Sequence, residues 1–181
     1  MSDWALISES TASGASSVSF TDLTGYKIFK FVFVDMHPAT TGDNYGHFQF
    51  NCSTDGSTYN VTKTTTFFWA MHNESGTDAV LEYSTGYDLA QSGSYQALVP
   101  SIGMENDESC AGELFLFNPT STTYVKHFYG RGHGYGSSDY AYDTFPAGYF
   151  NTTSALSSID FKFSTANIEN GTIKQYGLVA T

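Results

Sequence analysis

Two short stretches of the chain alternate strictly between apolar and polar residues. In GHFQFNC, Phe48 and Phe50 lie between polar neighbours, and in SIDFKFS, Phe161 and Phe163 do the same. Successive side chains of a β-strand point to opposite faces, so this pattern is typical of a strand with one face on the core. We therefore predict two half-buried strands and place these four phenylalanines in the core.

Other stretches predict further strands. YKIFKFVFVD is apolar on both parities in its middle, which indicates a central strand covered on both sides. Asp55-Gly56 and Asn170-Gly171 are strong turn signals. No segment shows sustained helical periodicity. The remaining strand candidates are WALIS, SVSF, TTFFWAMH, YQALV, ELFLF, TYVKHFY and TIKQYGL.

About ten short strands separated by frequent turns predict an all-β fold with almost no helix. We expect an antiparallel two-sheet sandwich, arranged like a jelly roll, while the strand order stays open. No linker or repeat divides the chain, so residues 1–181 are expected to form a single domain. Residues 1–17 are a candidate N-terminal arm.

Composition agrees with extended structure. Aromatic residues make up 17% of the 181 residues and charged residues only 14%, and strands favour aromatic and β-branched side chains. Eighteen acidic residues against seven basic ones give a net charge of −11. Phosphate backbones and anionic membrane surfaces attract clustered Lys and Arg. We therefore expect neither nucleic acid nor a membrane as a partner.

The chain holds two cysteines, Cys52 and Cys110, which are too few for a disulfide framework. Sequence alone leaves open whether they pair, and two reduced, buried thiols are the favoured alternative. The start, MSDWALISES, lacks a charged leader and a long apolar run. We expect no signal peptide and no transmembrane helix.

No motif indicates a nucleophile or a transition-metal site. The G-x-S-x-G elbow is absent, and neither H-E-x-x-H nor C-x-x-C occurs. His127 alternates with its neighbours on a predicted strand, so we expect it to face solvent. We therefore expect a protein without enzymatic activity and without a cofactor.

Carboxylates gather in two places. Glu105, Asp107 and Glu108 lie in GMENDESC, and Asp139 and Asp143 lie in SSDYAYD. Glycoside hydrolysis needs two acids opposed across a sugar, which neighbours on one loop rarely provide. A solvated acidic loop is the default interpretation. Glu105, Asp107 and Glu108 are also weak candidates for calcium ligands, without the EF-hand pattern.

The stretch HFYGRGHGYGSSDYAYDTF, residues 127–145, contains the only arginine. Its glycines permit positive φ and tight bends, which favours a loop. Aromatic rings stack on sugars, and tyrosine is also frequent where proteins meet. We predict an interaction loop that contacts protein or sugar. Its candidate binding residues are Tyr129, Arg131, His133, Tyr135, Tyr140 and Tyr142.

Four longer stretches resemble a family of short virion-associated proteins from tailed bacteriophages, especially marine ones. They are FTDLTGYKIFKFVFVDMHPAT, FQFNCSTDGSTYNVTKTTTFFWAMHNE, GELFLFNPTSTTYVKHF and AGYFNTTSALSSIDFKFSTANIENGTIKQYGL, and the likeness runs from Trp4 to Leu178. These phrases carry no catalytic motif. The resemblance implies a β-sandwich on the outside of a phage particle, made in the cytoplasm of the bacterial host.

Three hypotheses follow for the function. The first is a capsid decoration or cement protein that binds the major capsid protein and stabilises the shell. We expect its copies to form a symmetric oligomer, with a trimer favoured, and Ile7–Ser17 to pair as an arm with a partner's sheet edge. The alternative is a receptor-binding module of a tail or head fibre that binds host surface glycans. The third, a glycan depolymerase, would need two opposed acids.

Overall fold

The structure is a computed structural model that describes residues 3–178, and in that range it contains twelve strands and no helix. The described residues therefore contain no helix that could cross a membrane. The all-β, antiparallel prediction is confirmed. The strands are β1 (Trp4–Ala15), β2 (Val18–Phe20), β3 (Ile28–Pro38), β4 (Tyr45–Ser53), β5 (Lys63–Asn73), β6 (Ala79–Tyr83), β7 (Gln96–Gly103), β8 (Cys110–Phe117), β9 (Lys126–Gly136), β10 (Tyr140–Phe150), β11 (Ser158–Phe163) and β12 (Ile168–Leu178).

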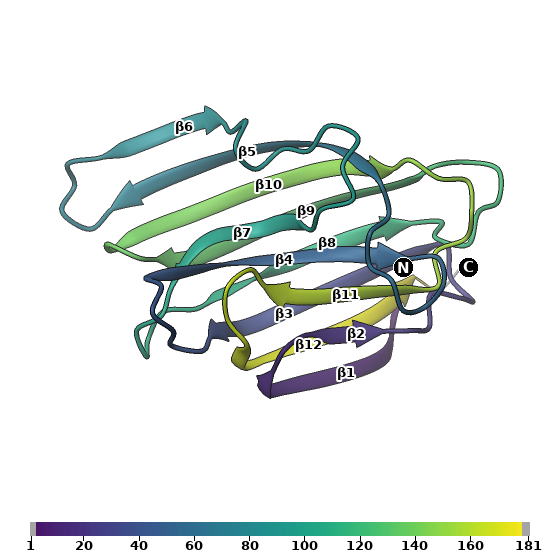
Figure 1. Cartoon of the computed structure of the whole chain (residues 1–181), viewed down its shortest axis with the longest axis horizontal. Helices are drawn as coiled ribbons and strands as arrows, with labels where there is room; N and C mark the ends of the chain where they lie inside the picture. The colour runs from purple at the N-terminus through teal and green to yellow at the C-terminus, as the bar shows by residue number, and fades with distance from the viewer. Residues whose placement is uncertain (1–2, 179–181) are drawn as a thin grey trace.

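Four of the antiparallel pairs are nested, so that the two strands of each pair lie, in sequence, between the two strands of the pair before it. β1 pairs with β12, β2 with β11, β3 with β8, and β4 with β7. Two hairpin insertions widen this arrangement. β9 pairs with β8, β10 with β9, β5 with β10, and β6 with β5. The chain is thus folded double along most of its length, with β5–β6 and β9–β10 added on one side (Figure 1).

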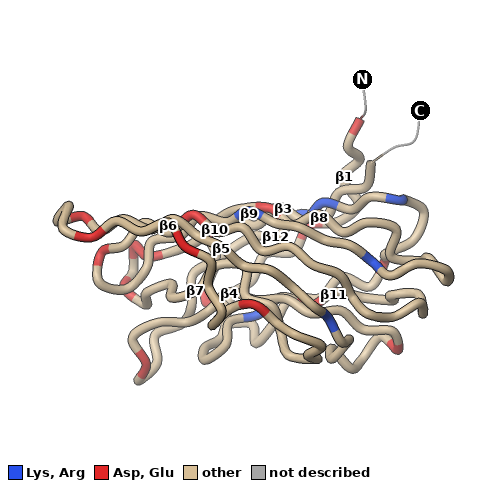
Figure 2. Tube along the Cα trace, turned by 90° about the horizontal axis from the view of Figure 1, so that it is seen from above, with Lys and Arg blue, Asp and Glu red and all other residues tan. Residues whose placement is uncertain are grey.

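The strands form one continuous sheet with two parts. We call β1-β12-β3-β8-β9-β10-β5-β6 the eight-stranded part and β7-β4-β11-β2 the four-stranded part. A single residue pair, Ile102 with Gly136, joins them. Figure 2 shows the two parts as layers lying one over the other. Each part therefore has an inner face toward the other and an outer face away from it.

The core lies between the two inner faces. Phe31 of β3 contacts Phe161 of β11 with ring centroids 5.4 Å apart, and Phe33 contacts Phe48 of β4 at 5.0 Å. The predicted core residues Phe48, Phe50, Phe161 and Phe163 are all buried, as alternation required. Cys52 and Cys110 are buried and free, which confirms two reduced thiols.

One prediction about β3 is wrong. The strand was expected to be covered on both sides, but only its inner face is buried. Lys30, Val32 and Val34 point to the outer face, and Val34 is 39% exposed. Apolar residues of both parities therefore indicate here an exposed apolar surface rather than a second covering layer.

The stretch 127–145 is not a loop. Its first part forms β9 and its last part β10, paired in register from Tyr140–Gly136 to Phe150–Lys126. The alternate glycines of β9 face inward in extended backbone. A methyl group on Gly132 would collide with Val99, and one on Gly134 with Ile102. These glycines therefore let β7 lie close against β9, rather than providing positive φ.

The hairpin turn between β9 and β10 does need left-handed backbone, but not at glycine. Ser138 and Asp139 have φ of 68° and 62°. Ser and Asp are weaker signals of positive φ than the four nearby glycines. From the sequence, the bends were therefore assigned to the glycines instead of to Ser138 and Asp139.

The predicted arm lies mostly within a strand of its own chain's sheet. Most of Ile7–Ser17 belongs to β1, which pairs along its length with β12 of the same chain. Residues 1 and 2 of the wider 1–17 range lie outside the described residues. The segment is an edge strand, because among the described residues β1 pairs only with β12.

Candidate interaction surface

Four of the six predicted binding residues lie together on the outer face of the eight-stranded part. Tyr129, Arg131, His133 and Tyr135 are alternate residues of β9, and they point outward while the glycines between them point inward. His127 is exposed on the same side, as predicted. The strand therefore presents a row of polar and aromatic side chains at a spacing fixed by the sheet.

The other two predicted residues do not join this row. Tyr140 and Tyr142 lie on the inner face of β10, where Tyr142 is only 7% exposed and stacks on Trp69 at 5.3 Å. Burial raises the pKa of Tyr142 to about 12. The register Tyr140–Gly136 puts even-numbered residues of both strands on one face. The prediction of a loop does not say which side chains share a face. It therefore could not separate the outward residues of β9 from the inward Tyr140 and Tyr142.

Arg131 is held in place by Asp143 and Phe145. Its Nε and Nη2 donate to the two carboxylate oxygens of Asp143 at 3.0 and 2.9 Å. Its guanidinium also lies 5.3 Å from the ring centroid of Phe145. The hydrogen bonds to the Asp143 carboxylate raise the pKa of Arg131 further above its usual value. This bidentate geometry fixes the orientation of the side chain.

Phe145 in turn stacks on Phe68, which sequence reasoning missed. The two residues are paired in register between β10 and β5, and their rings are 4.8 Å apart and inclined by 7°. One face of Phe145 is thus covered by Arg131 and the other by Phe68. Phe68 remains 43% exposed. The signal was present in TTTFFWAMH, where apolar residues occur on both parities.

A second aromatic group lies nearer β1. Tyr129 stacks against Phe115 at 5.0 Å, and its ring is tilted against that of Phe117 at 5.6 Å. Lys30 lies 4.8 Å from the ring centroid of Trp4. The outer face of the eight-stranded part therefore carries exposed and half-buried aromatic side chains from β1 to β6, namely Trp4, Phe115, Phe117, Tyr129, Phe145, Phe68 and Tyr83. We call this surface the aromatic face.

An open depression of about 460 Å³ lies on this face over β3, β8, β9 and β10. Its lining includes the Arg131–Asp143 ion pair, His133 and Glu113. Glu113 stands opposite Arg131 in the β8–β9 register. The depression is lined by Val32, Phe33, Val34, Ala111, Gly112, Glu113, Arg131, Gly132, His133 and Asp143.

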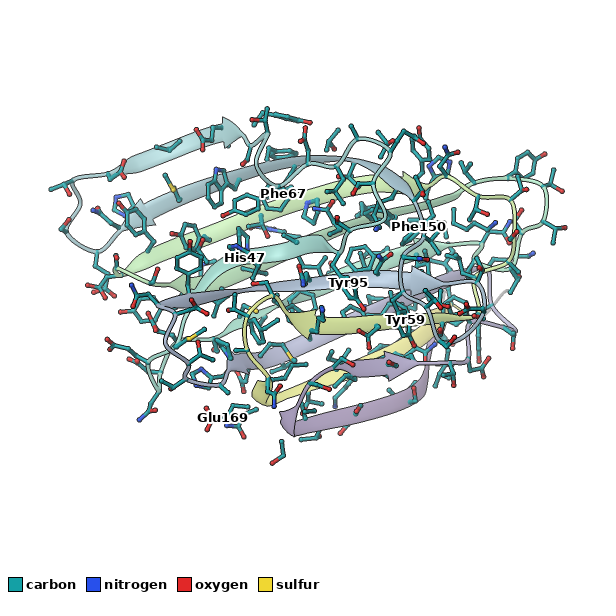
Figure 3. All side chains as sticks on the ribbon, viewed as in Figure 1. His47, Tyr59, Phe67, Tyr95, Phe150 and Glu169 are labelled. Atoms are coloured by element: carbon teal, nitrogen blue, oxygen red, sulfur yellow. The ribbon has the colours of Figure 1, made fainter. Side chains whose placement is uncertain are left out.

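The outer face of the four-stranded part differs, because the chain itself covers it. The buried Asn51 donates to the carbonyls of Tyr59 and Gly93 at 2.9 and 2.8 Å. Asp160 accepts from the hydroxyl of Tyr95 at 2.9 Å. Figure 3 shows Tyr59 and Tyr95 lying over β4 and β11. Segments 54–62 and 84–95 thus close this polar face.

The candidate acids lie in the turn between β7 and β8 and along the β9–β10 hairpin. Glu105, Asp107 and Glu108 lie in one turn between β7 and β8, where Glu108 Oε2 accepts from the Glu105 amide at 2.6 Å. Burial raises the pKa of Glu108. Asp139 accepts from Tyr135 at 3.0 Å, and Asp143 is paired with Arg131. Within residues 3–178 no three His, Cys, Asp or Glu side chains gather as metal ligands.

Acidic residues are concentrated at one end of the molecule. The turns that join β3 to β4, β5 to β6, β7 to β8 and β9 to β10 lie at that end, on the left in Figure 2, and carry no Lys or Arg. Their acids are Asp43, Glu74, Asp78, Glu105, Asp107, Glu108 and Asp139.

No family model, curated protein or solved structure matches this chain.

Proposed function

We propose that this protein is a non-enzymatic structural protein on the surface of a phage particle, and that it decorates the capsid by binding the major capsid protein. The aromatic face carries the proposal. Large exposed apolar surfaces on a soluble chain mark sites of association, and tyrosine, phenylalanine and arginine are frequent at protein interfaces. The sequence resemblance to virion-associated phage proteins supplies the setting.

We further propose that the fold is a jelly roll. In that architecture a long double strand wraps into two facing sheets, and it is common among viral capsid and lectin domains. The four nested pairs give β1-β12-β3-β8 in one layer and β2-β11-β4-β7 in the other, which is the expected order. The insertions β5–β6 and β9–β10 would then widen one sheet into the aromatic face.

The geometry of the rings favours a protein over a sugar. Stacking on a sugar needs an uncovered ring face, but Phe145 is covered on both faces and Tyr129 is stacked on Phe115. Neither Phe145 nor Tyr129 therefore offers both ring faces to a sugar. Packed aromatic side chains suit contact with the side chains of a protein surface. Arg131 already uses Nε and Nη2 on Asp143, which leaves fewer donors for sugar hydroxyls.

The test is binding to particles that lack the protein. We would add purified protein to such particles and measure bound copies by quantitative mass spectrometry against the major capsid protein. Hundreds of copies per particle would support decoration. Phe68→Ser with Tyr129→Ser should abolish binding, while Tyr124→Ser, which alters an exposed residue outside the aromatic face, should leave it unchanged.

A glycan-binding fibre module is the competing result. It would give at most a few dozen copies per particle, and binding of the isolated protein to host polysaccharide that Arg131→Ala removes. Binding to capsids that survives the double substitution would reject the aromatic face as the docking surface. No binding to any particle would reject the virion assignment itself.

A further inference from the structure

The sheet has edges, and they are protected to different degrees. β1 carries a register shift between Leu6 and Ser8 and an ion pair of 3.0 Å between Glu9 and Lys174. β2 is only three residues long. Bulges, charges and short length all hinder pairing with another chain. β6 has five residues, Ala79–Tyr83, and it pairs with β5 without a register shift.

The register shows which main-chain groups of β6 point to the free edge. The Ser84 amide donates to the Phe67 carbonyl at 2.9 Å, and the Asn73 amide donates to the Asp78 carbonyl at 3.1 Å. Hydrogen-bonding direction alternates along an antiparallel strand, so Val80 and Glu82 bond to β5. The amides and carbonyls of Ala79, Leu81 and Tyr83 therefore point away from β5. Among residues 3–178, β6 pairs with no other strand.

We propose that β6 pairs antiparallel with β6 of a second copy of this chain, across a two-fold axis at Leu81. This inference is independent of the proposed function. Leu81 would exchange two hydrogen bonds with its counterpart, and the small Ala79 would stand opposite the large Tyr83. Glu82, the only charged residue of β6, would face Val80 of the second copy, so no like charges would meet directly.

The side chains of β6 fit this pairing. Leu81 is 76% exposed, the highest value among the large apolar residues described. Tyr83 stands in register with Phe68 on β5, and Phe68 with Phe145 on β10. Two-fold pairing would extend this row of rings into the second copy, so that one sheet of sixteen strands carries two aromatic faces side by side.

The association should be weak and should strengthen with salt. A five-residue edge buries less area than a standard protein interface, so we expect a micromolar or weaker dimer. Each chain carries a net charge of −11, and added salt screens the repulsion between two such chains.

Sedimentation velocity over a range of protein concentrations tests the pairing. The chain should shift from monomer to dimer as concentration rises, more readily at higher salt. Leu81→Lys should remain monomeric, because it places a charge at the two-fold axis. Leu6→Lys, the matched change at the 54% exposed leucine of β1, should dimerise like the unchanged chain. A monomer at every soluble concentration, or a Leu81→Lys dimer, would overturn the proposal.

A disulfide test checks the register. Hydrogen-bonded antiparallel partners have Cα atoms about 5.5 Å apart, which a disulfide can bridge. Leu81→Cys should therefore form a covalent dimer on mild oxidation, since Cys52 and Cys110 are buried. Tyr83→Cys should not, because its two copies would lie about 14 Å apart along the strands. Equal cross-linking of both variants, or of neither, would contradict the two-fold at Leu81.

Discussion

The two outer faces of this molecule differ, because the chain covers one of them and leaves the other exposed. The four-stranded part turns polar side chains outward and then covers them with segments 54–62 and 84–95, so that Asn51 and Asp160 are buried and hydrogen-bonded. The eight-stranded part turns aromatic side chains outward and leaves them uncovered. Burying polar groups under a chain's own loops stabilises one fold, whereas leaving rings exposed costs solubility unless a partner covers them. The aromatic face is therefore the outer face that the chain's own segments leave uncovered.

The largest predicted effect separates the core from the aromatic face. Phe161→Ala removes a fully buried ring and should lower the free energy of unfolding by about 3–5 kcal/mol. Phe68→Ala removes a ring of the aromatic face and should cost less than about 1 kcal/mol. Urea denaturation monitored by circular dichroism measures both. Equal losses would mean that the aromatic face is part of the core.

The next effect separates the two sides of β9. Gly134→Ala points a methyl group at Ile102 and Val99, and overpacking of this kind should cost about 3 kcal/mol. His133→Ala, one residue away on the aromatic face, should change stability by no more than about 0.5 kcal/mol. The same urea denaturation measures the free energy of unfolding of both variants. A tolerated Gly134→Ala would show that β7 and β9 are not in close contact.

A pH-dependent effect involves a segment that covers the polar face. Lys63 is buried, its ammonium donates to the Ser94 carbonyl, and burial lowers its pKa from the usual 10.5 to about 8. The unfolded chain therefore binds more protons at this site between these values, so the contribution of Lys63 to stability should rise from pH 8 to pH 10, by about 2 kcal/mol. Burial also raises the pKa of Cys52 and Cys110, which acts in the opposite direction, so the measured quantity is the stability of the wild type minus that of Lys63→Met. A difference that does not rise from pH 8 to pH 10 would contradict the assignment.

The smallest effect compares two tyrosines. Tyr95→Phe loses the hydrogen bond to the buried Asp160 carboxylate and should cost about 1.5 kcal/mol. Tyr129→Phe on the aromatic face should leave the melting temperature unchanged, because its hydroxyl makes no side-chain hydrogen bond in the described residues. A larger loss for Tyr129→Phe would show that the aromatic face is important for folding.

Sequence predicted the parts of this fold that depend on local alternation. The inward side chains of β4 and β11 could be read from their strict period of two, and the all-β class followed from the turns. β6 and β10 were missed. The glycines before β10 were interpreted as bends, although they make room for β7, a contact between segments far apart in sequence. AVLEY in β6 has no alternation, because β6 has exposed residues on both faces.

The candidate site was predicted only in part for the same reason. Alternate residues of β9 could be recognised as a group, but the partners that fix them come from elsewhere. Asp143 orients Arg131, and Phe68 completes the stack with Phe145. Cross-strand register brings these residues together, and register depends on the closed hairpin and on long-range packing. A single sequence carries no direct signal for such contacts.

The most direct test of the central claim is hydroxyl-radical footprinting of the protein alone and after it is mixed with the phage particles of the proposed function. The radicals label exposed aromatic side chains, so the aromatic face and the remaining surface are measured in one experiment. We predict that Phe68 and Tyr129 become protected on the particle while Tyr124 stays as reactive as in the free protein. Protection of Tyr124 with full reactivity of Phe68 and Tyr129 would contradict binding through the aromatic face.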